Sequence, residues 1–306
     1  MATIQNKGPF RSLVAQLDKL ARHNRQGSFR TKERYYEACK RFCVYLAAEY
    51  HLQKLENISG KHLVSYVLYL QDTGKSASTI KTDLAAIRFF HDKLSNPKYT
   101  LPTNSELSVE LERRRFGQLD RTWSGPEFNR LLGKAMAENH DDFILALYLG
   151  RYAGLRIHEC FRIDTAVAER ALRENALTIK GKGGKVRTVP IEDERIPMML
   201  RKLLAQTERG HKLLVPDGMP TDRAINALEL FIYRHRNEIS DEGSDRRLTF
   251  HGLRHTYAAE QYTRLTESGM SAIDAHYAVS RLLGHERADV TNIYLASVRK
   301  RGRNVE

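Results

Sequence analysis

The fold of this chain is indicated most directly by ten residues, HGLRHTYAAE, at positions 251–260. They begin with two histidines and one arginine and then become apolar. On a helix, His251 and His255 would share one face because they are four residues apart, as the ligands of a zinc site do. His251 and Arg254 are three residues apart, which equally suits a clamp on a phosphate. These residues alone leave both kinds of site open.

The composition favours a polyanionic partner. The chain has 306 residues, enough for one large domain or two ordinary ones, and is 41% hydrophobic and 28% charged, as is typical of a globular protein. Its 50 lysines and arginines against 37 acidic residues give a formal charge of +13. This excess favours nucleic acid ahead of an anionic membrane surface as the partner.

The cysteines and the N-terminal residues predict a cytoplasmic protein. Cys39, Cys43 and Cys160 are the only cysteines, and so sparse and odd a number argues against a disulfide framework. The first residues, MATIQNKGPFRSL, contain no apolar run of the kind found in secretory signals. No apolar stretch approaches the length that spans a bilayer, so no membrane association is expected.

The first hundred residues predict helices. Apolar residues recur at helical spacing over 30–50, 59–75 and 76–94. Gly74 is expected just past the end of the second helix, and serine and threonine residues are expected to cap the third. Two prolines within 95–104 end this pattern, and a polar, arginine-rich segment follows.

The second half predicts helices and one small sheet. Residues 141–163 read as an apolar helix interrupted at Gly154, and the chain returns to helices from about residue 221. Between them, ALTIKGKGGKVRTVPI at 176–191 predicts two short strands. The strands flank two adjacent glycines, which are typical of a tight hairpin turn.

Five motifs follow one another in a fixed order over about 140 residues. They are G-L-R-x-x-E from residue 154, a G-K-G hairpin from 181, H-x-L-R-H from 251, L-G-H from 283 and a tyrosine at 294. Each motif alone is weak evidence, but together they resemble the tyrosine recombinase (phage integrase) family. The segment STIKTDLAAIRFF at 78–90 is also similar to the core-binding domain of that family. The resemblance covers most of the chain.

This resemblance implies a mainly α fold of two domains, in a simple recombinase of the Xer-like or mobile-element type. A helical, SAM-like core-binding domain is expected over 1–108, a linker over 109–123, and an α-rich catalytic domain with a small antiparallel sheet over 124–306. Together the two domains would form a C-shaped clamp around double-stranded DNA.

The family resemblance also implies site-specific DNA recombination through a 3′-phosphotyrosyl intermediate, with no metal ion and no nucleotide cofactor. Arg156 and Arg254 would clamp the nonbridging oxygens of the phosphate with planar, permanently charged forks. His285 would add a hydrogen bond to the same phosphate. Tyr294 would be the nucleophile, and His251 would accept its proton.

Two further residues would complete the catalytic set. Lys182 would be the general acid that protonates the leaving 5′ oxygen, with Lys180 and Lys185 as alternatives. Glu159, one helical turn after Arg156, would orient the site without touching the phosphate. The alternative for Glu159 is a surface ion pair.

DNA contacts outside the catalytic set are expected from basic residues in and after the first domain. The candidates are Lys75, Lys81, Arg88, Arg113, Arg114 and Arg115. For the last three, which are consecutive, the alternative is a solvated helix face.

The resemblance further implies a tetramer on two DNA sites and a Holliday-junction intermediate. DNA integration and mobile-element transfer are among the reactions implied, and accessory DNA-bending or directionality factors are among the candidate partners. The protein would act on the nucleoid. The chain between Arg254 and His285 is longer than is usual in the family, so it is expected to extend helices or a loop there.

Three rival interpretations stay open from the sequence. A type IB topoisomerase would share the chemistry but relax supercoils as a monomer. A non-catalytic DNA-binding protein would share only the fold. Zinc hydrolysis at His251 and His255 would lack the glutamate of H-E-x-x-H, because Gly252 stands in its place, and no third ligand is evident.

Overall fold

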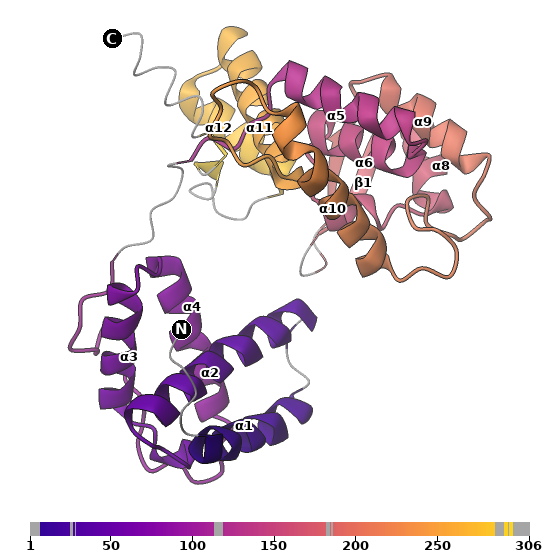
Figure 1. Ribbon diagram of the computed structural model, residues 1–306. Coiled ribbons are helices and arrows are strands. Elements are labelled where there is room, and N and C mark those ends of the chain that lie inside the picture. The colour runs from indigo at the N-terminus through magenta and orange to yellow at the C-terminus, as the bar shows by residue number, and fades with distance from the viewer. Residues whose placement is uncertain are drawn as a thin grey trace. The chain divides into compact units, whose positions relative to one another are not determined.

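Figure 1 shows a computed structural model of the chain, which describes residues 7–24, 27, 29–112, 119–181, 184, 186–284, 291–292 and 294–295. The chain folds as two compact units, residues 1–115 and 116–306. The described residues are mostly helical and form one two-stranded antiparallel sheet, so the predicted fold class is confirmed. Within this described part, none of the helices has the length and apolar character needed to cross a membrane.

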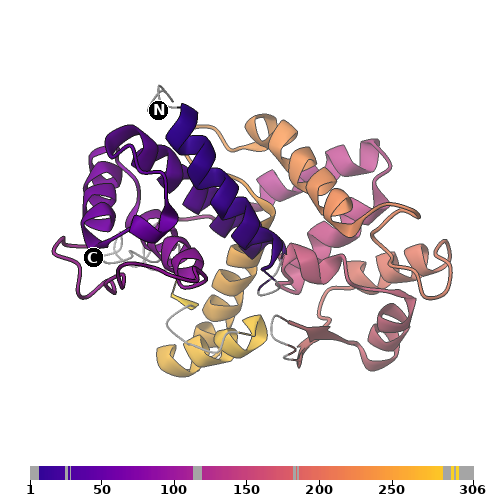
Figure 2. The same ribbon diagram turned by 90° about the horizontal axis from the view of Figure 1, so that it is seen from below.

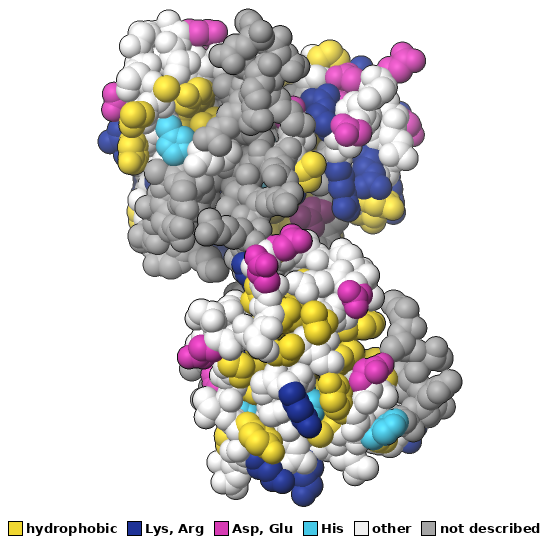
Figure 3. Space-filling model, turned by 90° about the vertical axis from the view of Figure 1, so that its left-hand side faces the viewer, with side chains coloured by type: hydrophobic (Ala, Val, Ile, Leu, Met, Phe, Trp, Pro, Cys, Tyr) yellow, Lys and Arg dark blue, Asp and Glu magenta, His cyan; other side chains and the backbone are white. Residues whose placement is uncertain are grey.

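The first unit is a helical bundle around one apolar core. Its helices are α1 (Lys7–Arg22), α2 (Phe29–Glu49), η1 (Leu55–Asn57), α3 (Gly60–Asp72) and α4 (Ala77–His91). The apolar faces of α2 and α4 pack together, and Phe42, Leu46 and Leu84 on them are fully buried. Seen from one side, hydrophobic side chains gather over the middle of this unit, with basic side chains at its lower edge (Figure 3).

Local signals set the helix ends of the first unit where the sequence predicts them. Gly74 follows α3 with a φ of 68°, a left-handed conformation that glycine adopts without steric cost. Ser76 caps α4, since its side chain accepts a hydrogen bond from the Thr79 backbone N–H at 3.2 Å. The predicted cap and C-terminal glycine are therefore confirmed.

The second unit is built around α6. Its elements are α5 (Gly125–Ala137), α6 (Asp141–Tyr152), α7 (Ile157–Cys160), α8 (Thr165–Glu174), β1 (Ala176–Lys180), β2 (Val186–Pro190), α9 (Arg195–Leu204), α10 (Thr221–Ile239), α11 (Phe250–Glu267) and α12 (Ala272–Leu283). Every residue of α6 from Phe143 to Arg151 is buried. Helices α5, α9 and α11 pack around it, which explains why its sequence is apolar on all sides.

The predicted strands pair as an antiparallel hairpin. Ala176 lies opposite Pro190 and Lys180 lies opposite Val186, so the connection spans residues 181–185 and is longer than a two-residue turn. β1 packs against α8 and β2 against α12, and Figure 2 shows the hairpin between these helices. This placement ties the hairpin to the C-terminal part of the unit.

The segment just before α5 is packed into the second unit. The Trp123 backbone N–H donates to Thr256 Oγ1 at 2.8 Å, and its indole Nε1 donates to the Thr249 carbonyl at 3.0 Å. Trp123 is 3% exposed, whereas Leu111 packs against the core of the first unit. The described ends of the predicted linker thus belong to different units, and its bounds stay a prediction.

Candidate active site

Arg156 lies in the short connection between α6 and α7. The chain turns there at Gly154, whose φ of 61° lies in the left-handed region that favours glycine. The Gly154 carbonyl accepts a hydrogen bond from Nη1 of Arg254 on α11. The interruption predicted at Gly154 is confirmed, and it brings two arginines that are distant in sequence to one place.

Replacing Gly154 with alanine should destabilise the second unit by about 2–5 kcal/mol, because left-handed strain and overpacking would combine. An added Cβ would lie only 2.3 Å from Cδ1 of Tyr257. Gly133 within α5 is the matched control, since an added Cβ there meets nothing within 4 Å. Gly133→Ala should be neutral or stabilising by up to about 1 kcal/mol in urea unfolding. Equal stabilities of the two variants would contradict this explanation.

Glu159 lies fully buried beneath Arg156. Its carboxylate accepts hydrogen bonds from the Arg156 backbone N–H at 2.8 Å and from Arg156 Nη1 at 3.0 Å. Arg187 on β2 donates two more, from Nη1 at 2.8 Å and Nη2 at 2.7 Å. Burial raises the pKa of Glu159, but the hydrogen bonds and charges of the arginines outweigh it and lower the pKa to about 2. The alternative of a surface ion pair is wrong, because the Glu159 side chain is 0% exposed.

Arg254 is fully buried at the start of α11. Besides its bond to Gly154, its Nη2 donates to the Leu283 carbonyl at the end of α12. Each terminal nitrogen of a guanidinium carries a second hydrogen that can bind another acceptor. Burial, and after it the charge of Arg156, lowers the pKa of Arg254 to about 10. The side chain therefore keeps its positive charge at neutral pH.

Tyr294 packs against Arg254, His251 and His255 of α11 and is 6% exposed. Its ring centroid lies 5.6 Å from Arg254 Cζ, 5.4 Å from the His251 ring centroid and 4.4 Å from the His255 ring centroid. The structure thus brings together four predicted catalytic residues: Arg156, His251, Arg254 and Tyr294. Two others lie outside the described residues: Lys182 and His285.

His251 borders a groove at the start of α11, and part of its side chain is exposed. Desolvation of the ring, followed by the charges of Arg254, Arg121 and Arg156, lowers its pKa to about 4. The arginine charges act in this direction even on the exposed part of the ring, so we take His251 to be neutral at pH 7. A neutral imidazole is able to accept a proton.

His255 is 1% exposed, so it lies on the packed side of the helix. Burial, and then the charges of His251, Arg121 and Arg254, lowers its pKa to about 3. Its ring lies over Tyr294 with an interplanar angle of 30°, so this buried histidine also forms part of the wall of the site.

The burial of His255 predicts acid sensitivity. An unfolded chain binds a proton on histidine near pH 6.5, whereas folded His255 binds one only near pH 3. The free energy of unfolding should therefore fall as the pH drops below about 6.5, with His255 contributing on the order of 2 kcal/mol between pH 7 and pH 5. His255→Phe should reduce the difference in urea stability between these two pH values by that amount. An unchanged difference would contradict a neutral, buried His255.

The pairing of His251 and His255 does not extend to a metal site in the described residues. Their rings meet edge to face at 83°, with centroids 5.1 Å apart. No group of three or more His, Cys, Asp or Glu side chains able to hold a metal ion occurs in the part of the chain that the structure describes. At Gly252, an added Cβ would lie 2.4 Å from the Arg121 carbonyl oxygen, so the glutamate of H-E-x-x-H does not fit there.

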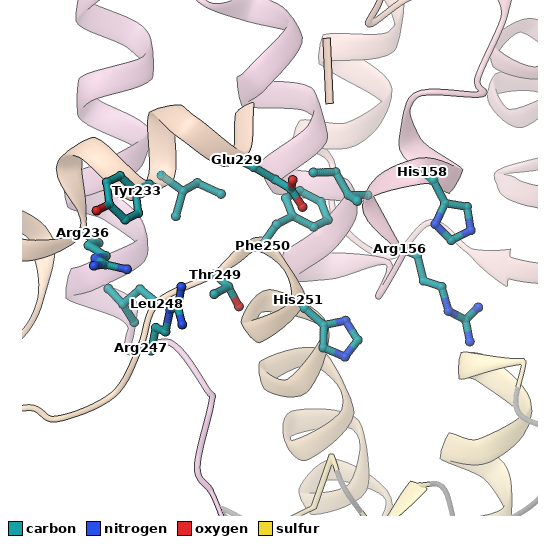
Figure 4. Close-up of a pocket in the computed structure, with 12 residues that line it drawn as sticks. Arg156, His158, Glu229, Tyr233, Arg236, Arg247, Leu248, Thr249, Phe250 and His251 are labelled. Carbon is teal, nitrogen blue, oxygen red and sulfur yellow. The ribbon is translucent and has the colours of Figure 1, made fainter. Parts of the chain in front are cut away.

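A groove of about 430 Å³ extends from these residues along α10. Figure 4 shows Arg156, His158 and His251 near one end, and Tyr233, Arg236 and Arg247 near the other. The Arg236 guanidinium lies 4.3 Å from the Tyr233 ring centroid, and Tyr233 is 56% exposed. The basic and aromatic residues of α10 could not be recognised from the sequence as part of the site, because they resemble an ordinary solvated helix face.

The predicted DNA-contact residues of the first unit differ in how they are engaged. Lys75 is exposed, and Lys81 Nζ donates to the Glu112 carbonyl at 2.6 Å. Arg88 Nε donates to the Pro102 carbonyl at 2.8 Å, so this side chain already holds the segment after α4. Three candidates lie outside the described residues: Arg113, Arg114 and Arg115. DNA contact by the described lysines and Arg88 stays a prediction.

Comparison with known proteins places the chain in a family. The model of the phage integrase family matches residues 127–301, and the model of the phage integrase N-terminal SAM-like domain matches residues 16–97. Because the first match alone spans more than half of the chain, the chain belongs to the phage integrase family.

Individual relatives match along most of the chain. Tyrosine recombinase XerD of Halalkalibacterium halodurans is 26% identical over an alignment of length 287, which covers 90% of this chain and 89% of the relative. Tyrosine recombinase XerC of Vibrio vulnificus is 30% identical over an alignment of length 243, which covers 72% of this chain and 66% of the relative.

Solved structures share the fold. A lambda integrase dimer bound to a COC′ core site matches with a TM-score of 0.61 and 16% identity, covering 92% of this chain and 77% of that one. XerH site-specific recombinase bound to difH substrate, in a pre-cleavage complex, matches with a TM-score of 0.60 and 18% identity, covering 100% of this chain and 91% of that one.

Proposed function

We propose that this protein is a site-specific DNA recombinase that cleaves and rejoins DNA through a covalent 3′-phosphotyrosyl intermediate. The observation that carries the proposal is the packing of Tyr294 over charged Arg254, with neutral His251 beside it, in a chain of the phage integrase family. Relatives of this chain are named tyrosine recombinases, which supports the same reaction class.

The two arginines suit the electrostatic part of this reaction. A phosphodiester is an anion, and further negative charge gathers on its nonbridging oxygens in the transition state. Arg156, 28% exposed at the groove, and Arg254 would each donate planar N–H groups to these oxygens. Because the Tyr294 ring lies over Arg254, we expect the ring to move aside when the phosphate enters.

The remaining catalytic residues act in nucleophilic attack, in proton transfer and in binding the phosphate. The Tyr294 oxygen attacks the phosphorus while its proton passes to neutral His251. The bond from phosphorus to the 5′ oxygen breaks, and that oxygen takes a proton from Lys182, which leaves a 3′-phosphotyrosyl ester and a free 5′-hydroxyl. His285 adds a hydrogen bond to the phosphate. Attack of a 5′-hydroxyl on the ester reverses these steps and rejoins the strand, so the ester conserves the energy for ligation.

DNA binding should depend strongly on salt, because phosphate contacts release counterions. Arg236 and Arg247 face the groove that begins at Arg156, so each is expected to contact a phosphate. In a plot of log affinity against log salt concentration, Arg236→Ala and Arg247→Ala should each reduce the slope by about 1. Arg201→Ala, on an exposed position of α9 outside the groove, is the control and should leave the slope unchanged. A flat salt response of the unmodified protein would contradict phosphate-dominated binding.

We further propose that the protein acts as a tetramer on two DNA sites, with the first unit as a core-binding domain. One structural neighbour is a lambda integrase tetramer bound to a Holliday junction, which supports such an assembly for this fold. Integration or excision of a mobile element is the corresponding process, carried out on the nucleoid in the cytoplasm. Accessory DNA-bending or directionality factors would be its additional partners.

A mapping experiment followed by two activity assays tests this function. The protein is incubated with genomic DNA that flanks its gene, covalent complexes are trapped with denaturant, and the ends of the attached strands are sequenced. The mapped site is then placed in pairs on a plasmid. Exchange between paired sites supports recombination, whereas relaxation of supercoils at many sequences without exchange would indicate a type IB topoisomerase. Binding without any covalent complex would indicate a non-catalytic DNA-binding protein.

A further inference from the structure

We propose that Arg187 is a positioning residue, which neutralises buried Glu159 so that the positive charge of Arg156 stays available to the scissile phosphate. The proposal rests on the proposed DNA cleavage, because the availability of Arg156 matters only if a phosphate binds there. Nothing in the family motifs described above points to Arg187. Its role is inferred from its contacts alone.

The contacts of Arg187 show that it supports the site and does not bind the phosphate itself. Its Nη1 and Nη2 both donate to the Glu159 carboxylate, at 2.8 and 2.7 Å. Its Nε donates to the Leu282 carbonyl at 3.1 Å, near the end of α12. The side chain is 10% exposed, and an added Cβ at Gly284 would lie 2.8 Å from its Cδ. The guanidinium is therefore enclosed and directed at Glu159.

The charges of three residues explain why this contact matters. Glu159 is 0% exposed, and an ionised carboxylate in such a place requires a partner of opposite charge. Arg187 and Arg156 together supply two positive charges against one negative charge, so one positive charge remains for the phosphate. Without Arg187, Arg156 alone would compensate Glu159. Its guanidinium would be drawn toward the carboxylate, and its attraction for a phosphate would be largely cancelled.

Arginine is required here for its geometry as well as its charge. Only a guanidinium presents two parallel N–H groups to a carboxylate while a third donor, Nε, binds elsewhere. Arg187 uses all three nitrogens in this way, and it joins β2 to α7 and to the end of α12. Lysine at this position would keep the charge but lose the paired bonds to Glu159 and the bond to Leu282.

The test compares four proteins in one cleavage assay: the unmodified protein, Arg187→Gln, Glu159→Gln and the double variant. The formation of covalent complex is timed on a nicked site, with DNA saturating. Arg187→Gln should slow the reaction about 100-fold, because one phosphate-binding arginine loses its effect. The double variant should be at least about tenfold faster than Arg187→Gln, since no buried negative charge then competes for Arg156. A double variant no faster than Arg187→Gln overturns the proposal.

DNA affinity and a conservative variant supply two further readouts. Arg187→Gln should change DNA affinity by less than about threefold, because most phosphate contacts lie elsewhere. Arg187→Lys should cleave at least about fivefold faster than Arg187→Gln, because it keeps the positive charge. Equal rates for these two variants would contradict charge compensation.

A second buried ion pair in the same unit provides the folding control. Glu127 is 0% exposed and pairs with Arg246 Nη2 at 2.9 Å, the same chemistry with no phosphate-binding arginine attached. Arg246→Gln should lower the melting temperature as Arg187→Gln does but leave cleavage at 20 °C within about threefold. If Arg246→Gln slows cleavage as strongly as Arg187→Gln, the effect is general destabilisation and the proposal fails. If the unmodified protein forms no covalent complex, the proposed function fails instead.

Discussion

The variant Tyr294→Phe should form no covalent complex with DNA, a loss of at least about 10⁴-fold relative to the unmodified protein. Phenylalanine keeps the aromatic ring but has no oxygen to attack the phosphorus. The ring is 6% exposed and packs against Arg254 and His255, so phenylalanine should preserve that packing. The fold and the DNA affinity are therefore expected to survive, and the loss should be confined to the chemical step. Denaturing electrophoresis of the protein with a labelled nicked site measures the complex.

Tyr257→Phe is the matched control for this variant. Tyr257 is 4% exposed and belongs to the same buried cluster as Tyr294, so both changes remove one hydroxyl from similar surroundings. The control should form the covalent complex at a rate within about tenfold of the unmodified protein. If Tyr294→Phe still forms the complex, another residue is the nucleophile.

The variant Lys182→Ala should slow cleavage by about 10²–10⁴-fold, the range for loss of a general acid. The leaving 5′ oxygen needs a proton because an alkoxide is a poor leaving group. A sulfur at the same position leaves as a thiolate, since a thiol has a pKa of about 8.5 and needs no donor. On DNA with a bridging 5′ sulfur, Lys182→Ala should therefore cleave nearly as fast as the unmodified protein. Similar impairment on both substrates would remove Lys182 as the acid.

The neighbouring lysines are the controls for that assignment. Lys180 is the last residue of β1, and Lys185 precedes β2 in the sequence. Lys180→Ala and Lys185→Ala should each slow cleavage of ordinary DNA by less than about tenfold and show no sulfur rescue. Rescue of either variant, with none for Lys182→Ala, would transfer the role of the acid to that lysine.

The features of the fold that could be predicted are those fixed by local chemistry. Ser76 caps α4, Gly74 follows α3 and Gly154 turns the chain after α6, because each needs only its own backbone and its nearest neighbours. The strands at 176–180 and 186–190 follow from alternation and flanking glycines. The length of the hairpin connection did not follow, since a glycine pair fits both a two-residue turn and a longer loop.

The parts of the site that could not be predicted depend on contacts between distant segments. Arg187 donates to Glu159 from another element, so its own stretch of sequence does not identify its partner. One signal was present. Arg187 and buried Val189 are two residues apart on β2 and therefore share a face, which places a charge on the inward face of a strand. Such a charge requires a buried partner.

The surface residues illustrate the same limit. Arg88 reads from the sequence as a basic residue on an exposed helix face, and DNA contact by this residue stays a prediction. In the structure it donates to the Pro102 carbonyl and to Asn104 Oδ1, both in the segment that follows α4. A helical pattern cannot show that a later segment folds back over the helix and takes up those donors.

The most direct test of this proposed chemistry is to identify the amino acid that becomes joined to DNA. The unmodified protein is trapped on a nicked site, digested with trypsin, and the peptide that carries nucleotides is sequenced by mass spectrometry. We predict a single modified peptide, with Tyr294 linked to the 3′ phosphate of the cleaved strand. A link to any of the other 13 tyrosines among the 14 in the chain, or to a 5′ phosphate, would contradict it.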